Sequence, residues 1–375
     1  MIIQKWSYIK GGAQEMSNNP KDIYKGDECM GFEKFSVEVL QIRGRSYDIG
    51  VQIGEKMKNH PIVITFEEMA KQVINIKNMK AIYEDFAPHL LDELEGLSEG
   101  LKLPFHRAAA ILSGYDMPKV EAMGCSAVIT KDYYVRNYDF SPRFYDHLFS
   151  FIQPEECHAS AGYNLQLIGR HDGVNSKGLV VGLHFVSNDS YKEGISAWTA
   201  IRMVLDSCAS TDEAIVMLKE IPHAACYNFS IGDKGGDIAV VEASPDKVAI
   251  RRGDHYLACV NHFLINELKE KNRKHIEHSI RRSAYIAYLE EQSLTAYQMF
   301  NEFSNRQSPL FFTEYGDLFG TMHTFAYSFT NARLQTKIAQ GIRGIDVNFD
   351  EWVNGKNIEY ADLKGKIEFD AKSKP

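Results

Sequence analysis

The sequence lacks three features that would place it in whole classes of protein. It has no basic excess, because 42 lysines and arginines stand against 50 acidic residues, a net charge of −8. A nucleic-acid-binding protein needs a basic face to neutralise phosphates, so this balance argues against one. The chain has no run of 18 apolar residues, and residues 1–10 lack the apolar core of a secretory signal. We expect a soluble cytoplasmic protein without a membrane or nucleic-acid partner.

Cysteine and histidine are present, but without the spacing of disulfide frameworks or metal sites. The six cysteines are scattered and form no CxxC pair, so we expect reduced thiols. The thirteen histidines contain no HxxxH pair and no companion carboxylate at ligand spacing. We therefore expect no metal and no cofactor. His262 is open to two interpretations, as a proton carrier or as a hydrogen-bonded core residue.

Hydrophobic periodicity predicts an α+β protein with layered sheets. Leu90, Leu94, Leu97 and Leu101 recur at the spacing of one buried helical face. Further helices are expected from about 47 to 57 and over 107–115, 197–209 and 275–291. Strands are expected over 35–42, 126–130, 133–136, 165–169, 178–186, 228–231, 238–243, 248–251, 256–260 and 324–330. Consecutive strands with helices in blocks favour this class over alternating βαβ units. The charged residues from about 357 onward are expected at the periphery.

The most informative segment is Gly124-Cys125 with the polar strand that follows it. Cys125 is expected to start a strand, and the next strand brings Arg136 and Asp139 back toward it. A guanidinium beside a thiol lowers the pKa of that thiol, and the thiolate is the nucleophile. Cleavage of the Gly124–Cys125 bond would create an α-amino group, with an ordinary pKa of about 7.7–8.0, that can serve as the base for its own thiol. A nearby carboxylate could anchor that amine. Taken alone, a cysteine that enters a strand is more often a small buried hydrophobe.

The motifs along the chain resemble those of the N-terminal-nucleophile linear amide hydrolases. Gly-Cys-Ser at 124–126, followed by Arg-Asn-Tyr-Asp at 136–139, is similar to the start of their catalytic chain. The motif order most resembles the branch of the fungal acyl-CoA:6-aminopenicillanic acid acyltransferase (isopenicillin N acyltransferase). Bile salt hydrolases and penicillin V acylases are more distant relatives. Five further motifs occur along the chain in the same order as in that branch. They lie at 44–50 and 95–100, before Cys125, and at 173–179, 260–263 and 279–282, after it.

This resemblance implies a four-layer αββα sandwich of two antiparallel sheets flanked by helices. It also implies that Cys125 is the nucleophile and that Asp139 orients it. The side-chain amide of Asn261 would help to hold the oxyanion. Arg136 resembles the arginine beside the nucleophile of bile salt hydrolases. One departure is that residues 319–323 contain no arginine where the fungal enzyme has a late one, so substrate handling there is expected to differ.

The resemblance also places the second oxyanion donor and the pocket. That donor would be the backbone N–H of His184 or Phe185. Asn175 and Arg282 belong to the matching motifs and are expected in the oxyanion or substrate pocket. A fixed donor of this kind is typically worth about 3–4 kcal/mol to a tetrahedral intermediate.

The expected precursor is one globular unit cut into two associated fragments. Residues 1–124 would form a mainly helical propeptide, and residues 125–375 the catalytic core. The nucleophile would attack a small-molecule amide or thioester. Hydrolysis of a linear amide is the first expectation, because the chain gives no sign of a coenzyme A partner, and acyl transfer to an amine is the second. Two rivals stay open, a non-catalytic binding relative and a Cys-His peptidase that does not cut itself, and a homo-oligomer is compatible with each.

Overall fold

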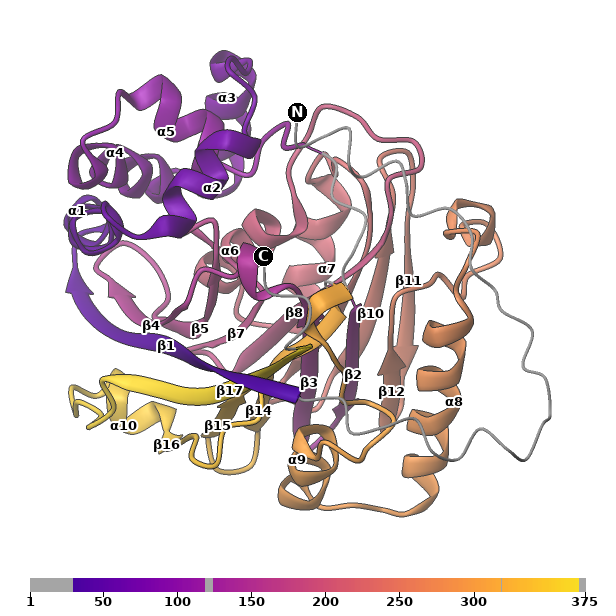
Figure 1. Ribbon diagram of the computed structural model, residues 1–375. Helices are drawn as coiled ribbons and strands as arrows, with labels where there is room; N and C mark the ends of the chain where they lie inside the picture. Colours follow the sequence, from indigo (N-terminus) through magenta and orange to yellow (C-terminus); the bar gives the residue numbers. More distant parts are fainter. Residues whose placement is uncertain (1–29, 119–123, 318, 371–375) are drawn as a thin grey trace.

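The computed structural model describes residues 30–118, 124–317 and 319–370, and two β-sheets form its centre (Figure 1). The larger sheet contains β1 (Met30–Gly44), β4 (Leu148–Pro154), β5 (Ser160–Leu165), β6 (Gly169–Arg170), β7 (Asp172–Asn175), β8 (Leu179–Ser187), β9 (Cys226–Asp233), β10 (Ile238–Ala243), β11 (Val248–Gly253) and β17 (Asp362–Asp370). The smaller sheet contains β2 (Gly124–Thr130), β3 (Tyr133–Phe140), β12 (Tyr256–Cys259), β13 (Thr313–Glu314), β14 (Phe319–Ser328), β15 (Arg333–Ile338) and β16 (Ile345–Asn348).

The strand order shows where the chain crosses between distant elements. The larger sheet runs β11-β10-β9-β8-β7-β5-β4-β1-β17, with β6 paired to β5. The smaller sheet runs β12-β2-β3-β14-β15-β16, with β13 paired to β14. Among the strand pairs of the described residues, only β1 and β4 are parallel. The prediction of two antiparallel sheets is therefore corrected at that one pair, where a strand from the start of the chain enters the sheet beside β4.

Helices cover the outer faces of the two sheets. The helices are α1 (Ser46–Met57), α2 (Pro61–Met69), α3 (Ile76–Phe86), α4 (His89–Leu101), α5 (Phe105–Leu112), α6 (Ala197–Ser207), α7 (Thr211–Glu220), α8 (Glu277–Glu291), α9 (Ala296–Ser304) and α10 (Phe349–Val353), with short 3-10 turns at η2 (Pro142–Phe144), η3 (Lys269–Lys271) and η4 (Tyr315–Asp317). Helices α6 and α7 pack on the larger sheet, and α8 and α9 pack on the smaller one. The result is the expected αββα sandwich, with α1–α5 grouped at one end (Figure 1). Within the described residues, no helix is both long and apolar enough to cross a membrane.

Polar side chains join the two sheets across the buried layer between them. Tyr134 on β3 shares a hydrogen bond with Ser230 on β9 at 2.7 Å. Tyr163 on β5 shares one with Thr336 on β15 at 2.6 Å. Every residue of β2 and β3 is buried, because one face meets the other sheet and the opposite face meets helices. A polar residue on either strand must therefore find a partner inside the protein.

The periodicity argument is confirmed where an element is long and regular. The four leucines of the predicted stripe are all buried on α4, and β10 has the predicted bounds. The predicted strand over 165–169 is wrong. Gln166 and Leu167 have φ values of 54° and 61°, so the chain turns there between β5 and β6. The C-terminal residues, expected at the periphery, form the edge strand β17 of the larger sheet, which pairs with β1 along nine residues.

Helices α1 and α4 approach each other through glycines. A Cβ placed on Gly50 would lie 2.1 Å from the carbonyl oxygen of Glu93, and one on Gly96 would lie 2.1 Å from that of Tyr47. Gly54 lies directly against Gly100, where the Cβ-to-Cα distance would be 2.9 Å. Real Cβ atoms do not come this close to backbone atoms, so the two helices can pack at this distance only with glycine at these positions.

We expect Gly96→Ala to destabilise the protein by about 2 kcal/mol or more. Alanine favours an isolated helix over glycine by about 1 kcal/mol, but here its methyl group would force the two backbones apart. Urea unfolding measures the change. Glu95→Ala, an exposed substitution on the same helix, is the control and should stay within about 0.5 kcal/mol. A Gly96→Ala protein as stable as the parent would contradict this account of the packing.

Candidate active site

Strand alternation decides which side chains reach Cys125. Side chains two residues apart on a strand share a face. Arg136 lies on the face of β3 that meets the larger sheet, and Asp139, three residues on, lies on the opposite face. In the β2–β3 register, Gly124 is opposite Asp139 and Ala127 is opposite Arg136. Arg136 therefore reaches the Cys125 side chain, while Asp139 lies beside the Gly124–Cys125 peptide bond.

Three groups of Cys125 have three different polar partners. Its Sγ accepts a hydrogen bond from Nη2 of Arg136 at 3.1 Å. Its backbone N–H donates to Oδ1 of Asn261 at 2.7 Å. Its carbonyl oxygen accepts from Nη1 of Arg282, which also donates to Oγ of Ser126 at 2.9 Å. All five residues are buried, so the thiol, amide and carbonyl of Cys125 are fixed together.

The Arg136 guanidinium carries its charge in the layer between the sheets. Nη1 pairs with Oδ2 of Asp172, and Nη2 also donates to the carbonyl of Leu183 at 2.5 Å. His323 Nε2 lies 2.8 Å from the same oxygen of Asp172. Burial acts to raise the pKa of Asp172, but His323 and Arg136 together hold that pKa below its ordinary value. Asp172 thus stays ionised and neutralises the guanidinium that touches the thiol.

One carboxylate oxygen of Asp139 has no hydrogen-bond partner among the described residues. Its Oδ1 accepts a hydrogen bond from Thr321 Oγ1 at 2.7 Å. Its Oδ2 has no hydrogen-bond partner among the residues that the structure describes, and Arg282 Nη1 is 4.0 Å away. Burial raises the pKa of Asp139 to about 6. A new cation beside Gly124 would therefore find an acceptor already in place.

Asn261 is oriented by four hydrogen bonds. Its Nδ2 donates to the carbonyl of Phe185 at 2.9 Å, and its backbone N–H donates to Ser279 Oγ at 2.9 Å. Its Oδ1 accepts from Arg282 Nη2 at 2.8 Å as well as from Cys125. Two N–H donors at Oδ1 fix which end of the amide is oxygen. In the uncleaved chain, the predicted oxyanion donor Nδ2 is therefore engaged with a carbonyl.

The thiol of Cys125 is kept neutral by its surroundings. Burial raises the pKa of this thiol above its ordinary value, and Arg136 offsets only part of that effect. The argument from sequence considered the guanidinium alone, which by itself lowers the pKa. Desolvation outweighs the guanidinium because the thiol is fully buried. An uncleaved chain thus holds its cysteine in the less reactive form.

The other predicted pocket residues divide into two groups. His184 and Phe185 lie on β8 next to the site, where His184 Nε2 is 2.9 Å from Ser230 Oγ and Phe185 supplies the carbonyl that holds Asn261. Burial lowers the pKa of His184 well below its ordinary value. Asn175 lies apart from Cys125. Its Nδ2 donates to two carbonyls at the end of α6 at 2.8 and 2.7 Å, and its Oδ1 accepts from the turn before β8.

Histidine does not hold the thiol by a hydrogen bond in the described part of the chain. Within the described residues, no histidine nitrogen makes a hydrogen bond to Cys125 Sγ. His262, the neighbour of Asn261, has its Nδ1 2.8 Å from Ser279 Oγ. Burial, followed by the charge of Arg282, lowers the pKa of His262 to about 4. Of its two interpretations, this geometry favours the hydrogen-bonded core residue.

The reasoning from sequence missed Asp172, His323 and Thr321. Asp172 and His323 hold Arg136, and Thr321 holds Asp139. One signal was available. An acidic residue beside a strand of apolar residues, as at Asp172, is expected to be paired, because an isolated charge is too costly to bury. Sequence alone did not say that its partner would be Arg136, in the other sheet.

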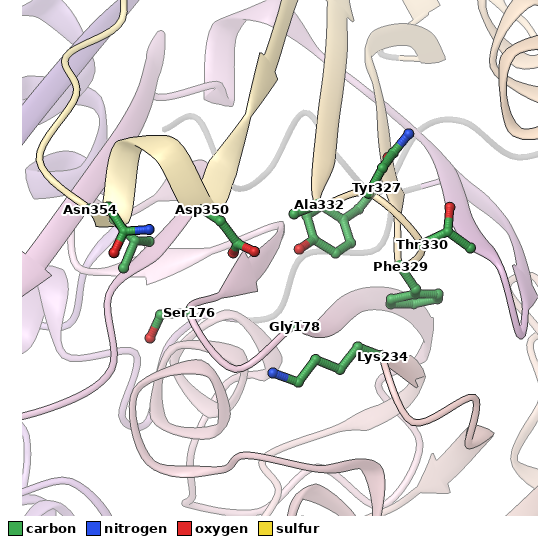
Figure 2. Close-up of a pocket in the computed structure, with 11 residues that line it drawn as sticks. Ser176, Gly178, Lys234, Tyr327, Phe329, Thr330, Ala332, Asp350 and Asn354 are labelled. Atoms are coloured by element: carbon green, nitrogen blue, oxygen red, sulfur yellow. The ribbon is translucent and has the colours of Figure 1, made fainter.

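A cavity of about 460 Å³ lies away from this cluster, between the turn after β14 and the turn before β8. Figure 2 shows the Lys234 ammonium and the Asp350 carboxylate on opposite sides of it. Tyr327 and Phe329 contribute aromatic rings to its wall. None of the predicted site residues lines this cavity, so it is separate from the chemistry at Cys125.

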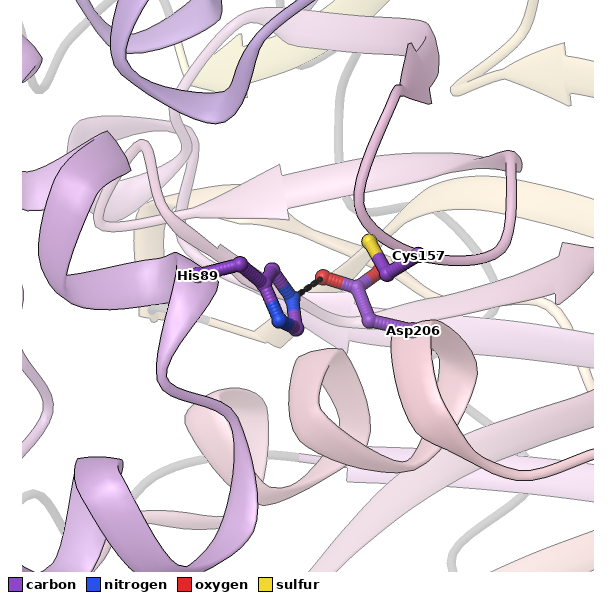
Figure 3. Close-up of side chains that lie close together, drawn as sticks. All are labelled: His89, Cys157 and Asp206. Carbon is purple, nitrogen blue, oxygen red and sulfur yellow. Dashed lines mark hydrogen bonds and ion pairs between the residues drawn. The ribbon is translucent and has the colours of Figure 1, made fainter.

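One group of side chains in the described chain has the spacing of metal ligands. His89, Cys157 and Asp206 lie within reach of one ion (Figure 3). His89 Nε2 is 2.9 Å from Asp206 Oδ2, and Arg202 Nε donates to that same oxygen at 2.8 Å. Arg202 also pairs with Glu93. A cation here would lie against the Arg202 guanidinium, and this repulsion disfavours metal binding.

The sequence profile of a known family matches residues 128–343. That family is described as acyl-coenzyme A:6-aminopenicillanic acid acyl-transferase. The match covers more than half of the chain. The chain belongs to this family. The matched region contains Arg136, Asp139, Asn261 and Arg282 and begins three residues after Cys125. No curated protein matches the chain.

Solved structures of amide-cleaving enzymes are distantly similar to this one. A variant of conjugated bile acid hydrolase from Clostridium perfringens has a TM-score of 0.40 at 13% identity, covering 66% of this chain and 96% of its own. Penicillin V acylase from Agrobacterium tumefaciens has 0.40 at 15% identity, covering 60% and 86%. The N-acylethanolamine-hydrolyzing acid amidase orthologue of Caenorhabditis elegans has 0.37 at 13% identity, covering 55% and 93%. At these scores the likenesses do not bear on the chemistry of this chain.

Asp139→Asn is expected to change how stability depends on pH. A carboxyl whose pKa is raised by folding binds its proton more tightly in the folded state, so its stabilising effect is present at low pH and is lost as the pH rises from about 4 to about 6. Asparagine does not titrate and keeps an acceptor for Thr321. In a Cys125→Ala background, Asp139→Asn should leave the stability near pH 4 almost unchanged and raise it by about 3 kcal/mol at pH 7. Urea unfolding at both pH values measures this difference, and a loss of stability at pH 7 would contradict it.

Proposed function

We propose that this chain is a self-processing amidohydrolase, which cuts itself between Gly124 and Cys125 and then hydrolyses a small linear N-acyl amide. One observation carries the proposal. Cys125 has a guanidinium at its thiol and, on the other face of the strand pair, a buried carboxylate oxygen beside its peptide bond that has no hydrogen-bond partner among the described residues. Membership of an acyltransferase family supports chemistry in which an acyl group moves onto the protein.

The first step is cleavage of the chain. Cys125 Sγ attacks the carbonyl carbon of Gly124, and the acyl group moves from nitrogen to sulfur. Water then hydrolyses this thioester, which leaves a carboxylate on Gly124 and both a thiol and an α-amino group on Cys125. Protonated, that amine pairs with Oδ2 of Asp139. The charge pair lowers the pKa of Asp139 and holds the amine beside its own thiol.

In turnover, the α-amine of Cys125 takes the thiol proton, and Arg136 stabilises the thiolate. The thiolate attacks the amide carbonyl carbon of the substrate. When the C–N bond breaks, the leaving amine takes the proton back from the α-ammonium group. Water then attacks the thioester, releases the acid and restores the thiol.

The oxyanion would be held by Asn261 Nδ2 and by the backbone N–H of His184 or Phe185. Nδ2 donates to the Phe185 carbonyl in the uncleaved chain, so it has to turn toward the substrate. Cleavage favours that change. In the uncut chain, the backbone nitrogen of Cys125 donates to Asn261 Oδ1, and after cleavage this nitrogen would pair with Asp139 instead. The loss of one such donor typically costs about 3–4 kcal/mol of transition-state stabilisation.

The two fragments are proposed to stay together after cleavage. Strand β1 belongs to residues 1–124, and it lies between β4 and β17 of the other fragment. Its departure would expose the unpaired edges of both neighbours, including nine residues of β17. The α1–α5 group is carried on the same fragment. The cut would therefore divide the polypeptide into two fragments while the strands of the larger sheet stay paired.

Acyl transfer to an amine is the second candidate, because the description of the family names an acyltransferase. It shares every step up to the thioester and differs in whether an amine or water attacks it. The partner of Sγ weighs against a Cys-His peptidase, since that partner is a guanidinium. A purely binding relative would not need the paired contacts at the thiol and at the N–H of Cys125.

We expect intact-mass spectrometry of the purified protein to find two chains that divide between Gly124 and Cys125. Cys125→Ala should give one uncut chain, because the substitution removes the proposed nucleophile. Cys259→Ala, which removes a buried thiol from the neighbouring strand β12, is the matched control and should be cut like the parent. Size-exclusion chromatography should elute both fragments together. An uncut parent chain would refute self-processing.

Hydrolysis and transfer are distinguished by the products of one reaction. With a simple N-acyl amide as substrate and hydroxylamine added, a hydrolase should release mainly the free acid, and a transferase mainly the hydroxamate. We expect the acid to dominate, as measured by chromatography of the products. Cys125→Ala should form neither product.

A further inference from the structure

The cavity of about 460 Å³ between the turn after β14 and the turn before β8 is built from both sheets. The larger sheet contributes Gly178 before β8 and Lys234 after β9. The smaller sheet contributes Tyr327 and the turn at 329–332, and α10 contributes Asp350. Small-molecule sites typically have volumes of about 300–1,000 Å³. A molecule bound here would therefore fit the cavity and contact four separate segments of the chain.

Tyr327 presents to this cavity a hydroxyl that has no hydrogen-bond partner among the described residues. The residue as a whole is 3% exposed. Burial, followed by the charge of Asp350, raises the pKa of Tyr327, so the hydroxyl keeps its proton and can donate it. The hydroxyl of a buried tyrosine normally has a partner. This one is left available to a bound molecule.

Two opposite charges face the same cavity without pairing. Figure 2 shows the Lys234 ammonium and the Asp350 carboxylate on opposite sides of it, and neither side chain has an ion pair or hydrogen bond within the described part of the chain. The Lys234 stem lies against Gly178, where an added Cβ would lie 3.0 Å from its Cδ. Asp350 is carried by α10, whose Phe349 and Trp352 are buried. Both charges are thus held in place by packed elements.

The pattern of charge decides which class of ligand fits. A dianion such as phosphate is repelled by Asp350, and a metal cation is repelled by Lys234. The rings of Tyr327 and Phe329, with centroids 5.7 Å apart, add an aromatic wall. A molecule that matches all three features carries an ammonium group and a carboxylate at separate ends of an apolar body.

We propose that this cavity is a second small-molecule site, which binds a zwitterion with its ammonium group against Asp350 and its carboxylate against Lys234. The apolar part of the ligand lies on Tyr327 and Phe329, and the tyrosine hydroxyl donates to it or to its carboxylate. The site lies apart from the cluster at Cys125. The inference therefore stands or falls by binding, whether or not the chain hydrolyses amides.

Three compounds that share one ring test the ligand class. 4-(Aminomethyl)benzoate carries both charges, 4-methylbenzoate lacks the ammonium group, and 4-methylbenzylamine lacks the carboxylate. None of them contains an amide bond, so the reaction proposed for Cys125 does not consume them. In calorimetry with the wild-type protein, the zwitterion should bind about fivefold more tightly than either counterpart, the upper range for one solvent-exposed ion pair. Equal affinities, or no binding of the zwitterion at millimolar concentration, would overturn the proposal.

Variants of the two charged residues test where the zwitterion binds. Lys234→Met should lower its affinity to the wild-type value for 4-methylbenzylamine, and Asp350→Asn to that for 4-methylbenzoate. Lys177→Met removes an exposed lysine beside Gly178 that does not line the cavity, and it should bind like the wild type. An affinity that neither cavity variant changes would place the probe elsewhere and refute the site. Binding of inorganic phosphate that Lys234→Met abolishes would contradict the zwitterion.

Tyr327→Phe separates a role in binding from a role in folding. The substitution keeps the ring and removes a hydroxyl that has no partner among the described residues, so the urea midpoint should not fall. The zwitterion should bind about threefold more weakly, because one neutral hydrogen bond is lost. A lower urea midpoint with unchanged binding would show that the hydroxyl serves the fold, and it would overturn the role of Tyr327 in the site.

Discussion

The site depends on one buried positive charge, that of Arg136. A guanidinium between two sheets is tolerated when its charge is balanced and most of its donors are taken. Asp172 balances the charge, and the Leu183 carbonyl and Cys125 Sγ accept further hydrogen bonds. His323 in turn holds Asp172. The contact between arginine and thiol is therefore part of the network that joins the sheets, and its geometry is set by the core of the protein.

Strand alternation separates the functions of the two groups around Cys125. Arg136 contacts the thiol from the inter-sheet layer, and Asp139 lies opposite Gly124 in the layer under α8 and α9. Neither residue could do the work of the other, because three positions along a strand always reverse the face. A single cysteine on β2 thus presents its sulfur to the Arg136 guanidinium on one face, while the Asp139 carboxylate lies opposite Gly124 on the other face. A nucleophile that also uses its own α-amine needs this division.

Local pattern predicted much of the fold and part of the site. Regular helices and strands follow from periodicity, and the hairpin after Gly124 brought Arg136 and Asp139 to Cys125 as expected. The prediction of a strand over 165–169 failed because Gln166 and Leu167 adopt left-handed turn conformations. Such conformations are usually predicted from glycine, and neither residue is glycine. Asp172 and Thr321 were missed for another reason. Their contacts join β3 to β7 and to β14, and pairing between strands that are distant in sequence leaves no local signal.

In the proposed mechanism, the same arrangement of Cys125, Arg136 and Asp139 serves the chain before and after cleavage. The electrostatics of the uncut chain explain how. Burial raises the pKa of the Cys125 thiol and raises that of Asp139 to about 6, so both groups resist ionisation while the peptide bond is intact. The proposed cut adds a cationic nitrogen between them. Its charge would be balanced by Asp139 Oδ2, which has no hydrogen-bond partner among the described residues, and the same charge would favour the thiolate beside Arg136. In the proposed mechanism, activation would need no rearrangement of strands, because one new charge would reverse the balance that keeps the cysteine neutral.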